Sequence, residues 1–505
     1  MNSNVKKGVK NISYGFLGQL ISLIIGLIVP RLILVNYGSE SNGLISSIGQ
    51  IFAYVALLEA GVGGATTQAL YSPVAKNDKE SISSILSATN IYYRRTGIIY
   101  VFAVVGLALF YPLIVPTELS YFVVFGIIIF NGMGGAINFL FQGKYYLLLT
   151  AEGKDYVQMN LTTALNVISS IAKVVLILLG VNIVTLQFAY FLINIAQMLF
   201  VVIYIKKNYP WLNVKSKPDY AAISQKNSVM VHQVSSLIFG NTDSLILTFF
   251  CGLKSVSVYS MPGLFIGCVD NLIRKISQGI LFSLGQSFHT SREKFMKIYN
   301  SFETFFYAAV SFSSTMIFLF LNPIIALYTK GVTDIQYINK FFPFLFTFLY
   351  WLSCARVPSI YVVNNCAGHF KQTAWRSVLE SSINIVVSLV GVIKFGMYGV
   401  IIGTIVALLY RTNDMIIYSA KYILNRSLWM AYKRLLVNGI LTIINIIIGK
   451  CLIPKISNYF EWVLYAFIFA VPLLVVFIGV NYLISPEEVK SIFKLLFNIF
   501  RHKNQ

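Results

Sequence analysis

The chain has 505 residues, of which 57% are hydrophobic and only 11% are charged, and its mean hydropathy is +0.73. Soluble proteins carry about 25% charged residues, and the deficit here extends along the whole chain, so the composition excludes a soluble domain with one anchor. It predicts an all-α polytopic membrane protein. The net charge of +21 lies mainly in short loops between apolar segments, where membrane orientation explains it and no nucleic acid is expected.

Fourteen apolar segments are long enough to cross a bilayer, for which a helix needs about 20 residues. The first follows a basic N-terminus and is longer than the apolar core of a signal peptide, so it is expected to be retained. The second and eighth are long enough to extend into the cytoplasm. The predicted spans are 12–35, 42–70, 91–115, 121–141, 157–180, 183–205, 229–251, 256–284, 302–327, 341–363, 377–393, 397–420, 435–452 and 462–484.

The distribution of Lys and Arg predicts an even number of spans with both termini in the cytoplasm. With the N-terminus inside, the inward-facing segments carry 29 of the 39 basic residues, the outward loops carry six and the spans carry four. Cytoplasmic loops are enriched in Lys and Arg, and a single missed span would invert every later loop and remove the bias. A multi-pass membrane protein with both termini in the cytoplasm is therefore expected.

The long basic loop divides the chain into domains. The prediction is an N-terminal six-helix lobe at 1–206, a cytoplasmic linker at 207–228 and a C-terminal six-helix lobe at 229–424. Residues 425–505 would add two further spans and a cytoplasmic tail. The tail has charged and apolar residues at helical spacing, which is typical of an amphipathic helix on the inner membrane surface; a short solvated helix is the alternative.

The sequence of the first six spans recurs in the next six. YYLLLTAEGK at 145–154 matches IYVVNNCAGH at 360–369, which aligns Gly153 with Gly368, 215 residues later. Because each half has six spans, both halves have the same orientation, and the repeat is predicted to be parallel. The last two spans have no counterpart.

Several segments carry a family resemblance. Pro30 and Arg31 in the first span are followed by VNYGSESNGL at 35–44 and by an acid–glycine step in LLEAGVGGATTQAL at 57–70. With the turns AEGK and AGHFK that follow the fourth and tenth spans, these segments resemble the Wzx-type oligosaccharide flippases of the multidrug/oligosaccharidyl-lipid/polysaccharide (MOP) exporter superfamily. The resemblance covers nearly the whole chain.

The resemblance implies a fold like that of the MATE transporters, with two parallel six-helix lobes and a C-terminal helix pair. It also implies a flippase that moves undecaprenyl-diphosphate-linked oligosaccharide repeat units by alternating access, for the synthesis of capsule, O-antigen or exopolysaccharide. Membrane lipids and a polysaccharide polymerase or other assembly proteins are the implied partners. A peptidoglycan-precursor flippase and a cation-coupled drug exporter are the alternatives within the superfamily.

A diphosphate headgroup that crosses hydrocarbon needs a hydrated path and cations that offset its charge. Arg suits this role because its planar guanidinium donates two parallel hydrogen bonds to phosphate. For Arg31 the alternative is snorkelling toward the outer surface, and for Arg411 it is an intrahelical pair with Asp414, three residues later. The candidate substrate-binding cations are Arg31, Lys173, Arg274, Arg356 and Arg411.

Three acids at membrane depth, Glu59, Asp243 and Asp270, are candidates for ion coupling or gating. An ionised side chain there costs about 2.5–3.5 kcal/mol on insertion scales, so such residues are rare and usually functional. Glu59 and Asp270 occupy matching places in the two halves. A buried carboxylate can carry a proton or bind a cation, so the coupling ion would be H⁺ or Na⁺. An interhelical ion pair that closes a gate is the alternative.

Two further acids, Glu303 and Glu380, lie near the cytoplasmic ends of their predicted spans and are expected to be solvated or to act in gating. The scattered Cys and His residues predict no metal site and no other cofactor. No GxxxxGK[ST] loop for nucleotide binding occurs, which argues against an ATP-driven pump. A membrane polysaccharide polymerase is the alternative of a different class, but the external loops are short for sugar chemistry.

Overall fold

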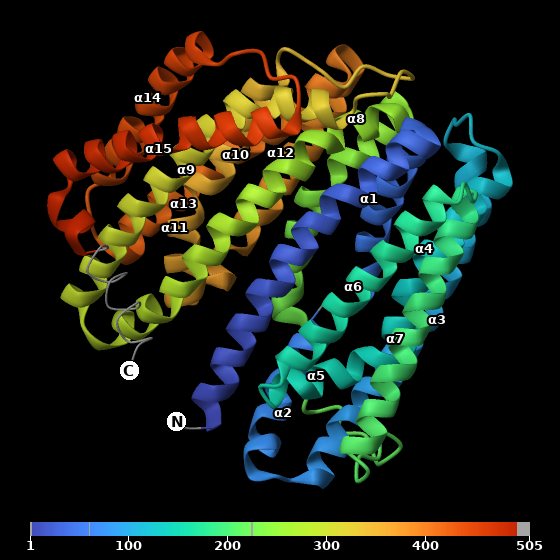
Figure 1. The fold of residues 1–505 in the computed structure, drawn as a ribbon. Helices are drawn as coiled ribbons and strands as arrows, with labels where there is room; N and C mark the ends of the chain where they lie inside the picture. The colour runs from blue at the N-terminus through green and yellow to red at the C-terminus, as the bar shows by residue number, and fades with distance from the viewer. Residues whose placement is uncertain (1–2, 60, 224–225, 492–505) are drawn as a thin grey trace. The chain divides into compact units, whose positions relative to one another are not determined.

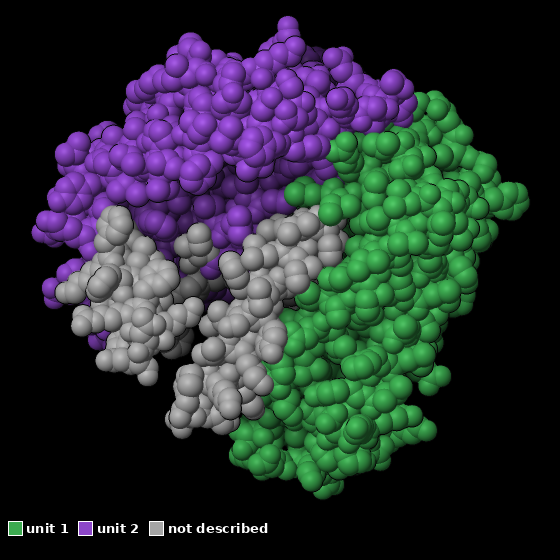
Figure 2. Space-filling view, viewed as in Figure 1, with its two compact units in different colours: residues 1–257 green, residues 258–505 purple. Residues whose placement is uncertain are grey.

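The computed structural model describes residues 3–59, 61–223 and 226–491, and the regular structure in these ranges is helical (Figure 1). Two compact units divide the chain, Met1–Ser257 and Val258–Gln505 (Figure 2). The helices of the first unit are α1 (Ser3–Ala56), η1 (Leu57–Glu59), α2 (Val62–Lys76), α3 (Lys79–Ile114), α4 (Tyr121–Ile137), η2 (Asn138–Gln142), α5 (Gly143–Ala151), α6 (Asp155–Leu178), α7 (Ile183–Asn208) and the first part of α8 (Lys226–Thr290). The second unit contains the rest of α8, then α9 (Arg292–Tyr328), α10 (Phe342–Ala355), α11 (Val357–Ile360), η3 (Tyr361–Cys366), α12 (Phe370–Phe395), α13 (Met397–Tyr418), η4 (Ser419–Leu424), α14 (Leu428–Leu452) and α15 (Tyr459–Ile484).

Eleven helices in the described part of the chain are long and apolar enough to cross a membrane by length and composition. The predicted first and second spans both begin in α1, and the predicted seventh and eighth spans both lie in α8. The prediction of an all-α polytopic membrane protein is confirmed. The C-terminal tail beyond residue 491, for which an amphipathic helix is predicted, lies outside the described residues.

One glycine interrupts each of the two longest helices. Gly38 in α1 has φ 81° and ψ 173°, and Gly252 in α8 has φ 80° and ψ 169°. Glycine reaches this positive-φ conformation without the steric penalty that a Cβ imposes. Both glycines lie between two predicted spans and are 214 residues apart. The same backbone turn therefore recurs at the offset of the sequence repeat.

A second backbone feature recurs at nearly the same offset. Gly153 (φ 67°) and Gly368 (φ 66°) both have a positive φ in the short turn that precedes a long helix, α6 or α12. The alignment of these two glycines in the sequence thus corresponds to one shared local conformation. This recurrence agrees with a duplicated six-helix unit.

Side-chain caps define where several helices begin. The Asp78 carboxylate accepts a hydrogen bond from the Ser81 backbone N–H at the start of α3, and the Ser291 hydroxyl does the same for Lys294 at the start of α9. Such caps satisfy donors that a helix leaves unpaired in its first turn. The hydrogen bonds from Ser81 hold the pKa of the Asp78 carboxyl below its usual value.

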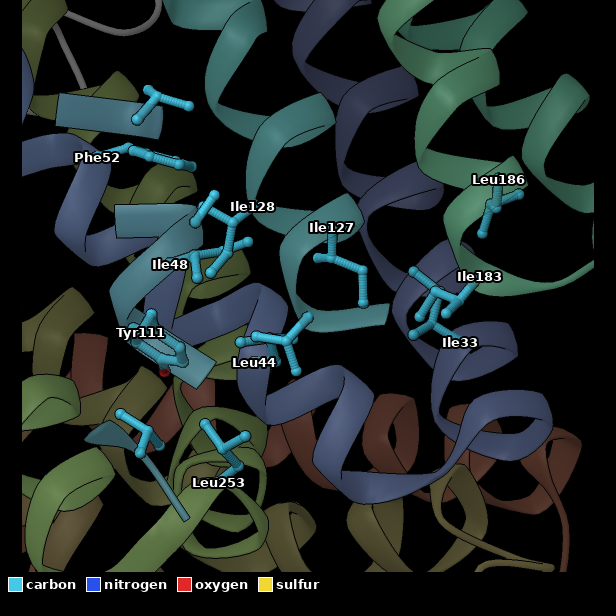
Figure 3. Packing of buried hydrophobic residues seen from close by; sticks show 14 of the residues in the cluster. Ile33, Leu44, Ile48, Phe52, Tyr111, Ile127, Ile128, Ile183, Leu186 and Leu253 are labelled. Atoms are coloured by element: carbon cyan, nitrogen blue, oxygen red, sulfur yellow. The ribbon is translucent and has the colours of Figure 1, made fainter. Parts of the chain in front are cut away.

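The first unit has an apolar core in which α1, α3 and α4 meet. Ile48, Phe52, Tyr111 and Ile128 are buried together there, and Leu253 from α8 lies beside them (Figure 3). α4 also packs against α7, and α1 packs against α6. Since transmembrane helices gain no net hydrophobic energy by leaving lipid, this close packing depends on shape and on hydrogen bonds.

Small residues bring α12 and α13 of the second unit into close contact. A Cβ added to Gly399 would lie 2.1 Å from the Gly391 carbonyl oxygen, and one added to Gly403 would lie 2.2 Å from the Ser388 hydroxyl. The Asn384 side chain donates a hydrogen bond to the Thr404 hydroxyl at 2.9 Å across the same contact. The two helix backbones therefore touch, which fixes the positions of the charged residues toward the start of α12 and the end of α13.

Much of the predicted linker at 207–228 is attached to the first unit. Residues 213–219 make hydrogen bonds to α3: the hydroxyls of Ser84 and Ser87 donate to the carbonyls of Lys217 and Ser216, and the Asp219 N–H donates to the Ser84 carbonyl. This segment is thus a strap on one end of α3. The predicted division into lobes and linker stays a prediction.

A small charged cluster lies just before the strap, at the end of α7. Tyr209 donates a hydrogen bond to the Glu152 carboxylate at 2.5 Å, and the Lys154 ammonium contacts Glu152 at 2.6 Å and Tyr209 at 2.9 Å. Burial by itself would lower the pKa of Lys154, but its hydrogen bonds to Glu152 and Tyr209 raise the pKa above its usual value. The turn that carries Gly153 is therefore tied to the end of α7.

The predicted second span, 42–70, is wrong as a continuous helix. α1 ends at Ala56, a short 3₁₀ turn follows, and α2 begins at Val62 after Gly61, whose φ is 87°. A positive φ at Gly61 ends the helical path, and Pro73 lies inside the helix that follows. Glu59 is therefore in a break between two helices, a position that hydropathy alone does not reveal.

Candidate functional site

Arg356 stands at the break between α10 and α11 in the second unit. Pro358 follows it, and because proline has no backbone N–H to donate, it interrupts the hydrogen bonds of the helix at this point. The guanidinium Nη1 of Arg356 donates to the Oε1 of Glu380 on α12. The arginine is thus directed toward α12 and α13.

Arg411 on α13 lies at the centre of a set of charges. Its Nη1 donates to Oδ2 of Asp414 at 2.8 Å, its Nη2 donates to the Ser377 hydroxyl at 2.9 Å, and its Nε lies 3.4 Å from Oε2 of Glu380. Only 5% of the Arg411 side chain is exposed. The predicted pair with Asp414 is present, but Arg411 also contacts α12.

Arg376 on α12 is the last member of the set. Its Nη1 donates to Oδ1 of Asp414, and its guanidinium lies 4.9 Å from the centre of the Tyr418 ring and 5.1 Å from that of Trp375. The Nε of Arg376 is buried and has no hydrogen-bond partner among the described residues. A cation over an aromatic face is favourable, so both rings help to hold this guanidinium in place.

These five residues alternate in charge, and we call them the ion-pair chain: Arg356, Glu380, Arg411, Asp414 and Arg376. Three arginines face two carboxylates, so the chain has a formal charge of +1. Both ends are arginines, and they are more exposed (15% and 22%) than the central Arg411. The excess positive charge therefore lies at the accessible ends.

The other three predicted cations lie elsewhere. Arg31 on α1 and Lys173 on α6 belong to the first unit, where the Lys173 ammonium lies 4.0 Å from the centre of the Tyr190 ring. Arg274 on α8 donates from Nε to Asp270 at 2.7 Å, the i,i+4 pair that the sequence spacing allows. Of the five candidates, the structure brings Arg356 and Arg411 together, through Glu380.

The three predicted acids occupy unlike surroundings. Glu59, in the break after α1, accepts a hydrogen bond from the Tyr93 hydroxyl of α3. Asp243 is buried in the first part of α8, next to Thr242, whose hydroxyl is 2.6 Å from that of Tyr54. Asp270 lies in the continuous part of α8 and pairs with Arg274. The matching positions of Glu59 and Asp270 thus have different backbones, and the role of all three in ion coupling stays a prediction.

Glu303 and Glu380 were expected to be solvated or to act in gating; the first alternative is wrong, and the second stays a prediction. Glu380 is inside the ion-pair chain, and the Glu303 side chain has no exposed surface. Oε1 and Oε2 of Glu303 accept hydrogen bonds from Arg426 at 2.5 and 2.8 Å and from Arg434 at 2.7 Å. Arg434 also contacts Glu488 at 2.9 Å. This second cluster therefore connects α9 to α14 and to the segment after α15.

Arg426 lies in the loop between η4 and α14. Burial by itself would lower its pKa, but the charge of Glu303 raises the pKa above the usual value for arginine. Arg376, Arg426 and Arg434 were not among the predicted cations because all three fall in predicted loops. For Arg376 a local signal was present: it lies four residues before Glu380, a spacing that places two residues on the same face of a helix.

A hydrogen-bonded seam occupies the first unit between residues 42–54 of α1 and 242–257 of α8. The Asn42 amide donates to the Ser257 hydroxyl at 2.8 Å, and the hydroxyls of Ser47 and Thr248 are 2.8 Å apart. A Cβ on Gly43 would lie only 1.9 Å from the Leu253 carbonyl oxygen. The polar side chains of the seam are buried, and the two backbones are in contact. Its apolar neighbours Leu44 and Leu253 are labelled in Figure 3.

Comparison with known proteins supports the fold. No protein-family model matches the sequence, and no curated protein matches it either. Among solved structures, the lipid II flippase MurJ in an inward closed conformation gives a TM-score of 0.69 at 15% identity, over 93% of this chain and 99% of that one. An inward-facing multidrug resistance MATE family transporter of the MOP superfamily gives 0.63 at 14% identity, over 84% and 95%.

A third similar structure is a MOP superfamily transporter from Pyrococcus furiosus, with a TM-score of 0.57 at 15% identity, over 84% of this chain and 98% of that one. Each match covers nearly the whole of the known transporter, so the likeness is one of the complete fold. This chain is a multi-pass membrane protein with the MATE- and MurJ-like fold of the MOP superfamily transporters.

Proposed function

We propose that this protein is a flippase that translocates undecaprenyl-diphosphate-linked oligosaccharide repeat units across the bacterial cytoplasmic membrane by alternating access. The observation that carries the proposal is the ion-pair chain: a membrane-embedded set of charges with three arginines against two carboxylates. An excess of buried positive charge is costly without an anion, and a diphosphate supplies one. Both termini would lie in the cytoplasm, and a polymerase outside would use the product.

The cargo diphosphate would be bound at the two ends of the ion-pair chain, by the guanidinium groups of Arg356 and Arg376. A guanidinium offers five N–H donors in a planar fork that suits phosphate, and each of these two arginines is anchored by an ion pair to a carboxylate. Glu380 and Asp414 keep the two arginines oriented, and Arg411 holds the two acids in place. Arg31 and Lys173 would contribute further positive charge from the first unit.

Two alternatives use the same fold. The peptidoglycan-precursor flippase is favoured by the similarity to MurJ, which is described as a flippase of lipid II; its cargo would meet the same arginines. A cation-coupled drug exporter is favoured by the MATE transporters, but the formal charge of +1 would repel a cationic drug. The Pyrococcus furiosus protein, described as having a binding pocket of reversed polarity, supports the idea that this fold takes cargo of either charge.

Reconstituted protein with a fluorescent undecaprenyl-diphosphate oligosaccharide tests the proposal. A membrane-impermeant quencher reports which leaflet holds the label. We expect protein-dependent loss of protection, and we expect Arg376→Ala to slow it about tenfold to hundredfold, because a hydrogen bond to a charged group contributes about 1.5–3 kcal/mol. Arg376→Lys would retain the charge but not the paired donors, and it should give an intermediate rate.

The matched control is Arg95→Ala, which removes an exposed arginine of α3 and should leave the rate unchanged. Equal loss in Arg95→Ala and Arg376→Ala would contradict binding by the ion-pair chain. Exchange of lipid II but not of the oligosaccharide lipid would favour the peptidoglycan-precursor flippase. Export of a cationic dye with no lipid exchange would favour the drug exporter. If neither lipid is exchanged and no dye is exported, and if loss of the gene changes the length of the polymer, the polymerase would be favoured.

A further inference from the structure

The guanidinium of Arg411 bridges two carboxylates on different helices. All three of its nitrogens are engaged, with Glu380 and Ser377 on α12 and with Asp414 on its own helix α13. The guanidinium is buried between these groups. It therefore has the surroundings of a bound cation: two anions and one neutral oxygen donor that converge from two chain segments.

The two carboxylates share the positive charge of Arg411. Close contact between Gly391 and Gly399 holds α12 against α13, so Glu380 and Asp414 cannot move apart as independent surface acids would. Two carboxylates that face one buried volume repel each other, and a cation between them relieves the repulsion. Each acid also pairs with an end arginine of the ion-pair chain, and Arg411 is the cation that contacts both acids.

The two end arginines of the ion-pair chain are more exposed than Arg411: 15% of the Arg356 side chain and 22% of the Arg376 side chain are accessible, against 5% for Arg411. Arg434 also contacts two carboxylates, but 25% of one of them, Glu488, is exposed. Both carboxylates that Arg411 contacts are largely buried, with 8% and 10% of their side chains exposed.

We propose that Glu380, Asp414 and Ser377 form a binding site for a monovalent cation between α12 and α13, and that the guanidinium of Arg411 is its permanent occupant. The second unit then has a built-in cation between these two helices. Without the Arg411 side chain, the site takes a free guanidinium ion or an alkali cation. This inference concerns the protein itself and does not depend on the identity of the cargo.

An Arg411→Ala variant retains the other side chains that line the site. Glu380 keeps its contact with Arg356, and Asp414 keeps its contact with Arg376, so each carboxylate still has one partner. The Asn384–Thr404 hydrogen bond and the glycine contacts between the helices are unaffected. Truncation therefore leaves a space of about the size of the lost guanidinium, lined by two carboxylates.

The test is the melting temperature of the full-length protein in detergent with guanidinium, sodium or choline chloride at equal, low concentration. Arg411→Ala should melt several degrees below the unmodified protein. Guanidinium should restore about half of the loss or more, since a ligand that binds only the folded state stabilises it by mass action; sodium should restore less, and choline none. The unmodified protein and Arg376→Ala, in which Arg411 still fills the site, should not respond.

Equal stabilisation of Arg411→Ala by choline and guanidinium would show a general salt effect and overturn the proposal. An equal response of Arg376→Ala to guanidinium would do the same. If Arg411→Ala cannot be purified in a folded form, Arg411→Gln keeps most of the volume without the charge and is tested in the same way. Failure to recover either variant, even with guanidinium present throughout purification, would show that no free cation replaces Arg411.

Discussion

Replacing Glu303 with glutamine is expected to lower the stability of the protein by about 3–5 kcal/mol, because removal of one partner leaves buried charges without compensation. The side chain of Glu303 is fully buried and accepts hydrogen bonds from two arginines and from the Tyr299 hydroxyl. Glutamine has nearly the same shape, so the change removes charge and little else. Arg426 would lose its carboxylate partner, and Arg434 would keep Glu488 as its carboxylate partner.

The measurement is the melting temperature in detergent, with the yield of monodisperse protein as a second readout. Glu293→Gln is the matched control, since Glu293 is exposed in the first turn of the same helix, α9. We expect this control to stay close to the unmodified protein. If the Glu303→Gln protein melts like the control, the ion pairs of Glu303 with Arg426 and Arg434 contribute nothing to stability.

The second large effect is expected at Gly43. Gly43→Ala would place a methyl group 1.9 Å from the Leu253 carbonyl oxygen, a distance that backbone atoms do not tolerate. Alanine normally stabilises a helix by about 1 kcal/mol relative to glycine, but here the seam between α1 and α8 must separate to admit it. We expect a net loss of about 1–3 kcal/mol, the usual cost of overpacking, seen as a lower melting temperature.

Gly49 provides the control for this prediction. It lies six residues further along α1, and an added Cβ would meet no atom within 4 Å. Gly49→Ala should therefore be neutral or slightly stabilising, which isolates the effect of the seam from that of helix propensity. Equal behaviour of the two alanine variants would show that the seam is not in contact at Gly43.

The sequence was informative where a feature depends on local composition. Apolar length predicted the helices, since only a helix satisfies its own backbone hydrogen bonds in lipid. Gly153 and Gly368 were aligned from sequence and adopt the same positive-φ turn. The pair of Arg411 with Asp414 followed from i,i+3 spacing on one helix. Each of these properties is fixed by residues within a few positions of one another.

The predictions failed where a residue's surroundings come from distant parts of the chain. Glu303 looked solvated because it lies near a predicted helix end, yet Arg426 and Arg434, more than 120 residues later, enclose it. Glu59 looked like a mid-span acid because hydropathy does not register the break at Gly61. Arg376 was assigned to a loop, but α12 begins at Phe370 and carries it to Asp414.

The sequence by itself thus determined the class of protein and the approximate positions of its spans. Hydrophobicity and charge bias act additively along the chain, so they can be read without a fold. Only the tertiary structure decided which charges are paired, because an ion pair between helices depends on how closely the helices pack. The contact of α12 with α13 brings four of the five charges of the ion-pair chain together, and Arg356 joins them from the break between α10 and α11. In the first unit, the absence of a side chain at Gly43 lets the backbones of α1 and α8 come into contact.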